Sequence, residues 1–170
     1  MAKARSDLTA DYVRSILDYQ IKTGALLWAV AKGRRVRAGC VAGYLNSTGY
    51  VYVKIDGRLY LAHRLVWLIH HNKWPEDQID HINRDKADNR IENLRAATNA
   101  ENHQNKASCV NSSSRFVGVS WESRTGKWQA QITTNGNRKY LGSFSTEDLA
   151  AAAYADAKSK LHVFNPTVVS

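Results

Sequence analysis

The pattern of hydrophobic and polar positions in the first third of the chain predicts one helix followed by short strands. Apolar residues recur at helical spacing at the start, so we expect an amphipathic helix over residues 8–20. A strand is expected at residues 26–30, and residues 46–55 alternate between polar and apolar side chains as a half-buried strand does. The Asp-Gly dipeptide that follows is a tight-turn signal, which predicts a hairpin closed by residues 58–61.

In the middle of the chain the pattern predicts a helix and then a second hairpin. Residues 63–71 carry a helical apolar stripe that stops before Pro75. Two β-branched residues, Ile79 and Ile82, enclose an Asp-His dipeptide and favour a short strand. Residues 85–89 are the Asp, Lys and Asn of a turn, so a hairpin is expected here.

The last third changes character after a serine-rich connector. The pattern predicts three strands and a helix, at residues 116–121, 127–134, 138–143 and 146–161. The helix has a narrow face of small residues that can pack on the sheet, made of Ala150, Ala153, Ala157 and Leu161. The opposite face of the sheet would stay polar, with the side chains of Gln129, Gln131, Thr133, Arg138 and Tyr140.

Charge adds an expectation about the partner. The chain has 170 residues and a formal net charge of +9. Residues 1–62 carry ten Lys or Arg against four acids, residues 63–107 seven against seven, and residues 108–170 seven against four. Positive flanks around a neutral centre indicate a polyanion partner, although excess charge can also serve only solubility.

Composition excludes several classes of protein. No apolar run is long enough to span a bilayer and the first residues lack the apolar core of a signal peptide, so we expect a cytoplasmic protein. Cys40 and Cys109 are the only cysteines, and neither belongs to a Cys-x-x-Cys pair. We therefore expect free thiols and no structural zinc.

The densest run of reactive side chains extends from Ile79 to Lys106. Thr98 and Glu101 form a capping pattern that predicts a helix over residues 99–106. If the preceding hairpin packs on this helix, the Asp80 carboxylate and the Asn102 amide oxygen can meet, and two hard oxygen donors suit Mg²⁺. Neutral His81 beside them is suited to take a proton from water, which favours phosphodiester hydrolysis. The alternative is an ordinary polar surface hairpin, since Asp and Asn dominate turns.

Four segments in order, Leu61–Trp67, Ile79–Asn83, Asp88–Arg95 and Asn99–Asn102, resemble the HNH endonucleases of phage and intron homing enzymes. The resemblance covers roughly residues 45–106 and implies a ββα-metal site. It implies metal ligation by Asp80 and Asn102, with Mg²⁺ or Mn²⁺ as one ion per site, His81 as the general base and Asn93 as the asparagine that orients it. Many members of the family have histidine at the position of Asn102. We assign charge stabilisation to Lys106 or Arg95, with a surface ion pair as the alternative for each.

A second resemblance covers about residues 114–166. Val117–Ser120, Gly126–Ile132, Tyr140–Phe144 and Ala152–Ala157 are similar to the AP2 DNA-binding domain. This similarity implies major-groove contact by Gly118, Ser120, Trp121, Gln131, Thr133, Arg138, Tyr140 and Ser143. Plant members have arginine at the positions of Val117, Ser120 and Thr133 and tryptophan at that of Tyr140, so the plant target sequence does not transfer.

Together these features predict an α+β protein with an N-terminal DNA-contacting region (1–62), an HNH nuclease core (63–107), a linker (108–115) and an AP2-like domain (116–166). Further phosphate contacts are expected from Arg34, Arg35, Arg37 and Arg64. The partner is expected to be double-stranded DNA, with no membrane and no small-molecule substrate, and one site per chain favours nicking by a monomer or weak dimer. A DNA-binding regulator with an idle nuclease fold and an RNA-directed nuclease are the rival hypotheses.

Overall fold

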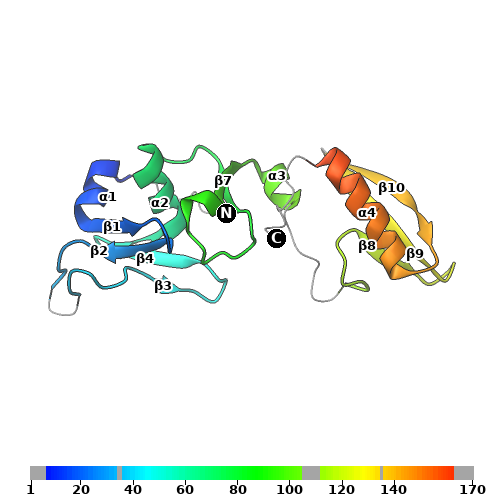
Figure 1. Ribbon diagram of the computed structural model, residues 1–170, viewed down its shortest axis with the longest axis horizontal. Coiled ribbons are helices and arrows are strands. Elements are labelled where there is room, and N and C mark those ends of the chain that lie inside the picture. Colours follow the sequence, from blue (N-terminus) through cyan, green and yellow to red (C-terminus); the bar gives the residue numbers. More distant parts are fainter. Residues whose placement is uncertain (1–6, 34–35, 105–111, 135, 163–170) are drawn as a thin grey trace. The chain divides into compact units, whose positions relative to one another are not determined.

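The computed structural model describes residues 7–33, 36–104, 112–134 and 136–162 (Figure 1). Its contacts divide the chain into two compact units, Met1–Ala97 and Thr98–Ser170. The described elements combine helices with small antiparallel sheets, which agrees with the expected α+β class. The expected nuclease core of residues 63–107 spans the boundary between the units, so its unity as one domain stays a prediction.

The first unit begins with a helix that is shorter than its sequence pattern predicts. Helix α1 (Ala10–Ile16) ends at the C-cap Leu17, and β1 (Leu17–Gln20) pairs with β2 (Ala25–Trp28) in an antiparallel hairpin. The prediction of a helix up to residue 20 was therefore wrong. Buried Leu17 and exposed Asp18 fit a strand as well as a helix, and pairing with β2 decides between the two.

A three-stranded antiparallel sheet and a helix follow, as the pattern predicts. The strands are β3 (Tyr44–Leu45), β4 (Val51–Ile55) and β5 (Arg58–Leu61), with β4 in the centre. The Asp-Gly turn between β4 and β5 is confirmed, since Asp56 and Gly57 have φ of 49° and 79°. Helix α2 (Ala62–His71) ends at Asn72, which adopts the left-handed conformation.

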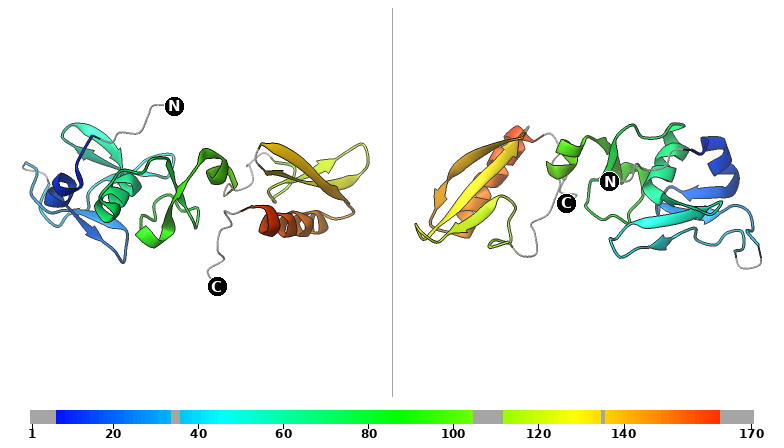
Figure 2. Two further views of the ribbon diagram at one scale, coloured as in Figure 1. Left: turned by 90° about the horizontal axis from the view of Figure 1, so that it is seen from above. Right: turned by 180° about the vertical axis from the view of Figure 1, so that it is seen from behind.

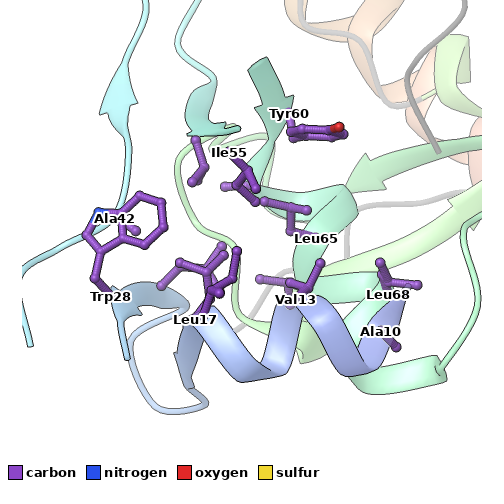
Figure 3. Packing of buried hydrophobic residues seen from close by; sticks show 14 of the residues in the cluster. Ala10, Val13, Leu17, Trp28, Ala42, Ile55, Tyr60, Leu65 and Leu68 are labelled. Carbon is purple, nitrogen blue, oxygen red and sulfur yellow. The ribbon is translucent and has the colours of Figure 1, made fainter. Parts of the chain in front are cut away.

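The core of the first unit lies between α1, α2 and the strands. Figure 3 shows Val13 of α1 and Leu65 of α2 close together, with Ile55 of β4 above them in the view. These side chains have no exposed surface. Shortening Leu65 to alanine would thus cost about 2–5 kcal/mol. This packing fixes α2 and β4 as the rigid support of the elements described next.

The second predicted hairpin is confirmed and completes the first unit. Strand β6 (Gln78–His81) pairs with β7 (Leu94–Ala97), and the 3₁₀ helix η1 (Ile91–Asn93) lies just before β7. Asp80 faces Arg95 across this pair, and His81 faces Leu94. The connection between the strands, residues 82–93, is the segment that surrounds His81.

The second unit starts with α3 (Asn99–Gln104), whose predicted capping pattern is confirmed. The Thr98 amide donates to Glu101 Oε2 at 2.8 Å, and the Glu101 amide donates to Thr98 Oγ1 at 3.3 Å. The strands β8 (Val119–Glu122), β9 (Lys127–Thr134) and β10 (Asn137–Phe144) form one antiparallel sheet, with β9 in the centre. Helix α4 (Glu147–Leu161) lies across one face of this sheet (Figure 2).

The predicted small-residue face of α4 is only partly right. Ala150 and Ala157 are buried, whereas Leu161 is 38% exposed. Leu161 is the last residue of the helix, four residues after the buried Ala157. Across the described residues, no helix has the length and apolar character needed to cross a bilayer.

Candidate functional site

His81 lies at the end of β6 in a buried position. Only 4% of its surface is exposed, and its Nε2 lies 3.4 Å from Oδ1 of Asn89. The Asn89 amide nitrogen donates to the Ala87 carbonyl at 3.1 Å, which directs the acceptor Oδ1 toward the imidazole. Nε2 therefore carries the hydrogen in the neutral ring, and Nδ1 is the ring nitrogen that can accept a proton.

Asn89, which the sequence analysis did not select, is anchored by the N-terminal hairpin. The Tyr19 hydroxyl donates to the Asn89 carbonyl at 3.2 Å and accepts from the Ile91 amide at 2.8 Å. Gly24, with φ of 74°, approaches this segment so closely that a Cβ would lie 2.5 Å from the Arg90 nitrogen. The hairpin β1–β2 thus supports the residue next to His81, and only the chain's three-dimensional path reveals it.

Two further rings pack around His81. His63 of α2 meets it edge to face, with ring centroids 5.0 Å apart and an interplanar angle of 90°. The Tyr50 ring lies 6.0 Å from His81 and 5.5 Å from His63. Aromatic contacts of this kind contribute about 0.5–1.5 kcal/mol each beyond burial, so they restrain the orientation of the His81 ring.

Both histidines are neutral at physiological pH. Burial lowers the pKa of His81, although the hydrogen bond to Asn89 and the nearby carboxylates of Asp80, Asp85 and Asp88 oppose that effect. Burial also lowers the pKa of His63 to about 3, and the neighbouring His81 adds to the decrease. A neutral imidazole is the form that accepts a proton, so burial keeps His81 in the protonation state of a general base.

The predicted metal ligand Asp80 forms an ion pair. Its Oδ2 accepts from Nε of Arg95 at 2.9 Å and from the second guanidinium nitrogen at 2.7 Å. Asp80 is 5% exposed, whereas the Arg95 side chain is 21% exposed. Of the alternatives that the sequence left open for Arg95, the structure shows the ion pair, and its partner is the predicted ligand itself.

Asn93 holds the connection behind His81. Its Oδ1 accepts from the Asn83 amide at 2.9 Å, and its amide nitrogen donates to the Asp88 carbonyl at 2.8 Å. Its own carbonyl accepts from the Ile82 amide at 2.9 Å. The side-chain oxygen that contacts Nε2 of His81 belongs to Asn89. Asn93 therefore holds together the connection of residues 82–93. Direct orientation of His81 by Asn93 stays a prediction.

Metal binding by Asp80 together with Asn102 also stays a prediction. Asn102 is half-buried in α3, within the second unit, and Lys106 lies outside the described residues. The described part of the chain contains no group of three or more His, Cys, Asp and Glu residues placed to hold an ion. The donor types do fit: a carboxylate and an amide oxygen are hard ligands, which Mg²⁺ and Mn²⁺ prefer, and Mg²⁺ uses few protein ligands.

The expected phosphate contacts of the first unit have different surroundings. Arg64 donates to the carbonyls of Asp77 and Pro75, at 3.3 Å each, and lies over the Trp74 ring. It thereby ties α2 to the segment before β6. Arg37 is exposed, whereas Arg34 and Arg35 lie outside the described residues. Cys40 is an exposed free thiol, and Cys109 lies outside the described residues.

In the second unit, the strand register separates the predicted contact residues into two groups. One group shares the sheet face opposite α4, because its members face one another across the strands: Ser120, Gln131, Thr133, Arg138, Tyr140 and Ser143. Trp121 lies on the other face, since it pairs with Trp128 and its ring packs on that ring at 5.1 Å. Gly118 has φ of 75°, and a Cβ there would lie 2.2 Å from the Tyr154 ring.

Comparisons with known proteins agree with the position of this site. Residues 60–104 match the model of a family described as HNH endonuclease. The chain is 34% identical over 112 residues to a protein of Acanthamoeba polyphaga mimivirus named "Uncharacterized HNH endonuclease L560". That alignment covers 65% of this chain and 57% of the relative, so the chain spans little more than half of the relative's length. No solved structure matches the chain. The stretch from α2 through the His81 hairpin to α3 is thus the part of the chain that is similar to the HNH endonuclease family.

Proposed function

We propose that the chain is a divalent-metal-dependent endonuclease of the HNH homing type that nicks one strand of duplex DNA. The observation that carries this proposal is His81. It is a buried, neutral imidazole whose Nε2 contacts Asn89, so Nδ1 is the nitrogen that would act as the base, and Asp80 precedes it in the chain. The match of residues 60–104 to the HNH endonuclease family supports the same chemistry.

In the reaction, His81 takes a proton from the attacking water at Nδ1. The side-chain oxygen Oδ1 of Asn89 stabilises the imidazolium that forms, because it accepts the hydrogen on Nε2. Asp80 and Asn102 would hold the ion. An ion held there would polarise the phosphate and stabilise the leaving oxygen. The resemblance to HNH endonucleases implies products with a 5′-phosphate and a 3′-hydroxyl.

Arg95 has a defined part in this scheme. Its guanidinium neutralises the buried Asp80 carboxylate, which would otherwise be destabilised by burial.

The C-terminal sheet is proposed to direct the nuclease to its site as an AP2-like reader. The polar face opposite α4 presents amides, hydroxyls and an arginine, which are the groups that contact base edges in the major groove. Tyr140 is 58% exposed on this face, and its hydroxyl lies 2.6 Å from Ser143 Oγ. We place Trp121 outside the reading face because of its pairing with Trp128.

The test is a nicking assay on supercoiled plasmid with Mg²⁺ or Mn²⁺. We expect relaxed circles from the wild type, none after chelation of the metal, and a loss of at least a hundredfold in His81→Ala. His70→Ala is the matched control, because His70 is an exposed histidine at the end of α2. Plasmid binding without nicking would replace the proposal by the DNA-binding regulator, and preferential cleavage of RNA would replace it by an RNA-directed nuclease.

A further inference from the structure

Two arginines of the His81 hairpin are already neutralised by carboxylates. Arg95 pairs with Asp80, and Arg90 pairs with Asp88 and Glu92. Farther away, other ion pairs join Lys32 to Asp56 and Arg58 to Asp7. These side chains hold the fold together. Lys86, in the connection between β6 and β7, is different because it forms no ion pair with a described residue.

The Lys86 side chain is nevertheless held in place. Its Nζ donates to the Thr48 carbonyl at 3.1 Å and lies 4.9 Å from the centroid of the Tyr50 ring. Its aliphatic stem lies over Gly49, where a Cβ would be 3.6 Å from Lys86 Cδ. The carbonyl uses one of the three ammonium hydrogens, so the others remain for an anion. A lysine restrained by two contacts loses less side-chain entropy on binding than a free surface lysine does.

The position of Lys86 connects it to the site. The Tyr50 ring that carries the ammonium also contacts the His81 ring, at a centroid distance of 6.0 Å. Lys86 and His81 thus both contact the Tyr50 ring. Lys86 is exposed and charged, whereas His81 is buried and neutral. This arrangement suits a polyanion: Lys86 can bind one of its phosphates while another lies next to His81.

We propose that Lys86 binds a backbone phosphate of the DNA strand that is cut, next to the phosphodiester at His81. This inference rests on the proposed function, because it takes duplex DNA as the substrate. Lys86 would be a substrate-binding residue that positions the strand. Tyr50 would support it by a cation–π contact, which is worth about 0.5–1 kcal/mol at an exposed site. Contact with a single phosphate is sequence-independent, so its contribution depends on salt.

The test measures binding without catalysis. The affinity of full-length protein for a labelled duplex is measured by fluorescence anisotropy in EDTA over a range of NaCl concentrations. Loss of one phosphate contact reduces the slope of log K against log salt by about 0.9, which is roughly a fivefold weaker affinity at 0.15 M salt. We expect this change in Lys86→Met, which keeps the aliphatic stem, and recovery in Lys86→Arg.

Lys73→Met is the matched control, because it removes a cation from the same unit. Lys73 has a 70% exposed side chain and an ion pair with Glu76 at 3.9 Å, so its loss should leave the slope unchanged. An unchanged slope in Lys86→Met, or equal decreases in both variants, would overturn the inference. Circular dichroism spectra of the variants confirm that each is folded.

The location of the contact is tested with a chemically modified duplex. Once the nicked phosphodiester has been mapped, an uncharged methylphosphonate replaces each phosphate within two positions of it, one at a time. We expect one such replacement to weaken the wild type about fivefold and to leave Lys86→Met unaffected. If wild type binds duplex but never nicks it, the proposed function fails, while the salt slope still decides whether Lys86 contacts phosphate.

Discussion

Mildly acidic pH should destabilise the first unit, because the unfolded chain protonates His63 and the folded chain does not. His63 is 5% exposed, and its Nδ1 is buried without a hydrogen-bond partner among the described residues. Burial holds its pKa at about 3, against 6.5 for an unperturbed histidine. The unfolded chain therefore binds a proton below pH 6.5 that the folded chain excludes. Stability is complete above pH 6.5 and falls as the pH decreases toward 3.

The size of this effect follows from the two pKa values. At pH 5 the unfolded state gains about 2 kcal/mol from protonation of His63 that the folded state does not gain, and at pH 7 the difference is close to zero. The replacement His63→Leu removes this titration. It also removes the unpaired Nδ1, whose burial costs about 1–3 kcal/mol, so we expect this variant to be at least as stable as wild type at pH 7.

Hydrogen–deuterium exchange of the α2 amides provides the measurement, because it reports the free energy of opening of the first unit alone. The decrease in opening free energy between pH 7 and pH 5 should be about 2 kcal/mol smaller in His63→Leu than in wild type. His70→Leu is the control, since His70 is exposed in the same helix. If wild type and His63→Leu lose stability in parallel, His63 is not the residue that burial keeps neutral.

Three other replacements test the supports of the site. Arg95→Met should destabilise the first unit by about 3–5 kcal/mol, measured by the same exchange experiment, because the buried Asp80 carboxylate loses its ion pair with the guanidinium, and Arg95→Lys should recover part of this loss. Asn93→Ala removes two hydrogen bonds from the loop beside His81, so it should lower the free energy of unfolding by about 2–3 kcal/mol. It should also lower the nicking rate constant more than the DNA affinity, and a change in affinity alone would contradict this. Gly118→Ala should unfold the second unit and leave the first unit's amide spectrum unchanged, because its Cβ would lie 2.2 Å from the Tyr154 ring at a φ of 75°.

Most of the elements follow from local sequence signals. The Asp-Gly turn after β4, the capping pair of Thr98 and Glu101, and the alternation along β9 each act within a few residues, and all three are present. The prediction of where α1 ends was wrong because Leu17 suits either a helix or a strand. Its partner strand, β2, decides the matter, and the local pattern contains no information about that pairing.

The sequence by itself determined which side chains have the chemistry of the site, but not how they are paired. Asp80 and His81 stand next to each other in the chain, and their residue types alone indicate an oxygen ligand and a base. Only the tertiary structure showed that Asn89 contacts His81, that Tyr19 from a distant hairpin holds Asn89, and that His63 packs against the same ring. The physical reason is that local propensities extend over a few residues, whereas these contacts form when the core brings α2 and the N-terminal hairpin to the β6–β7 connection.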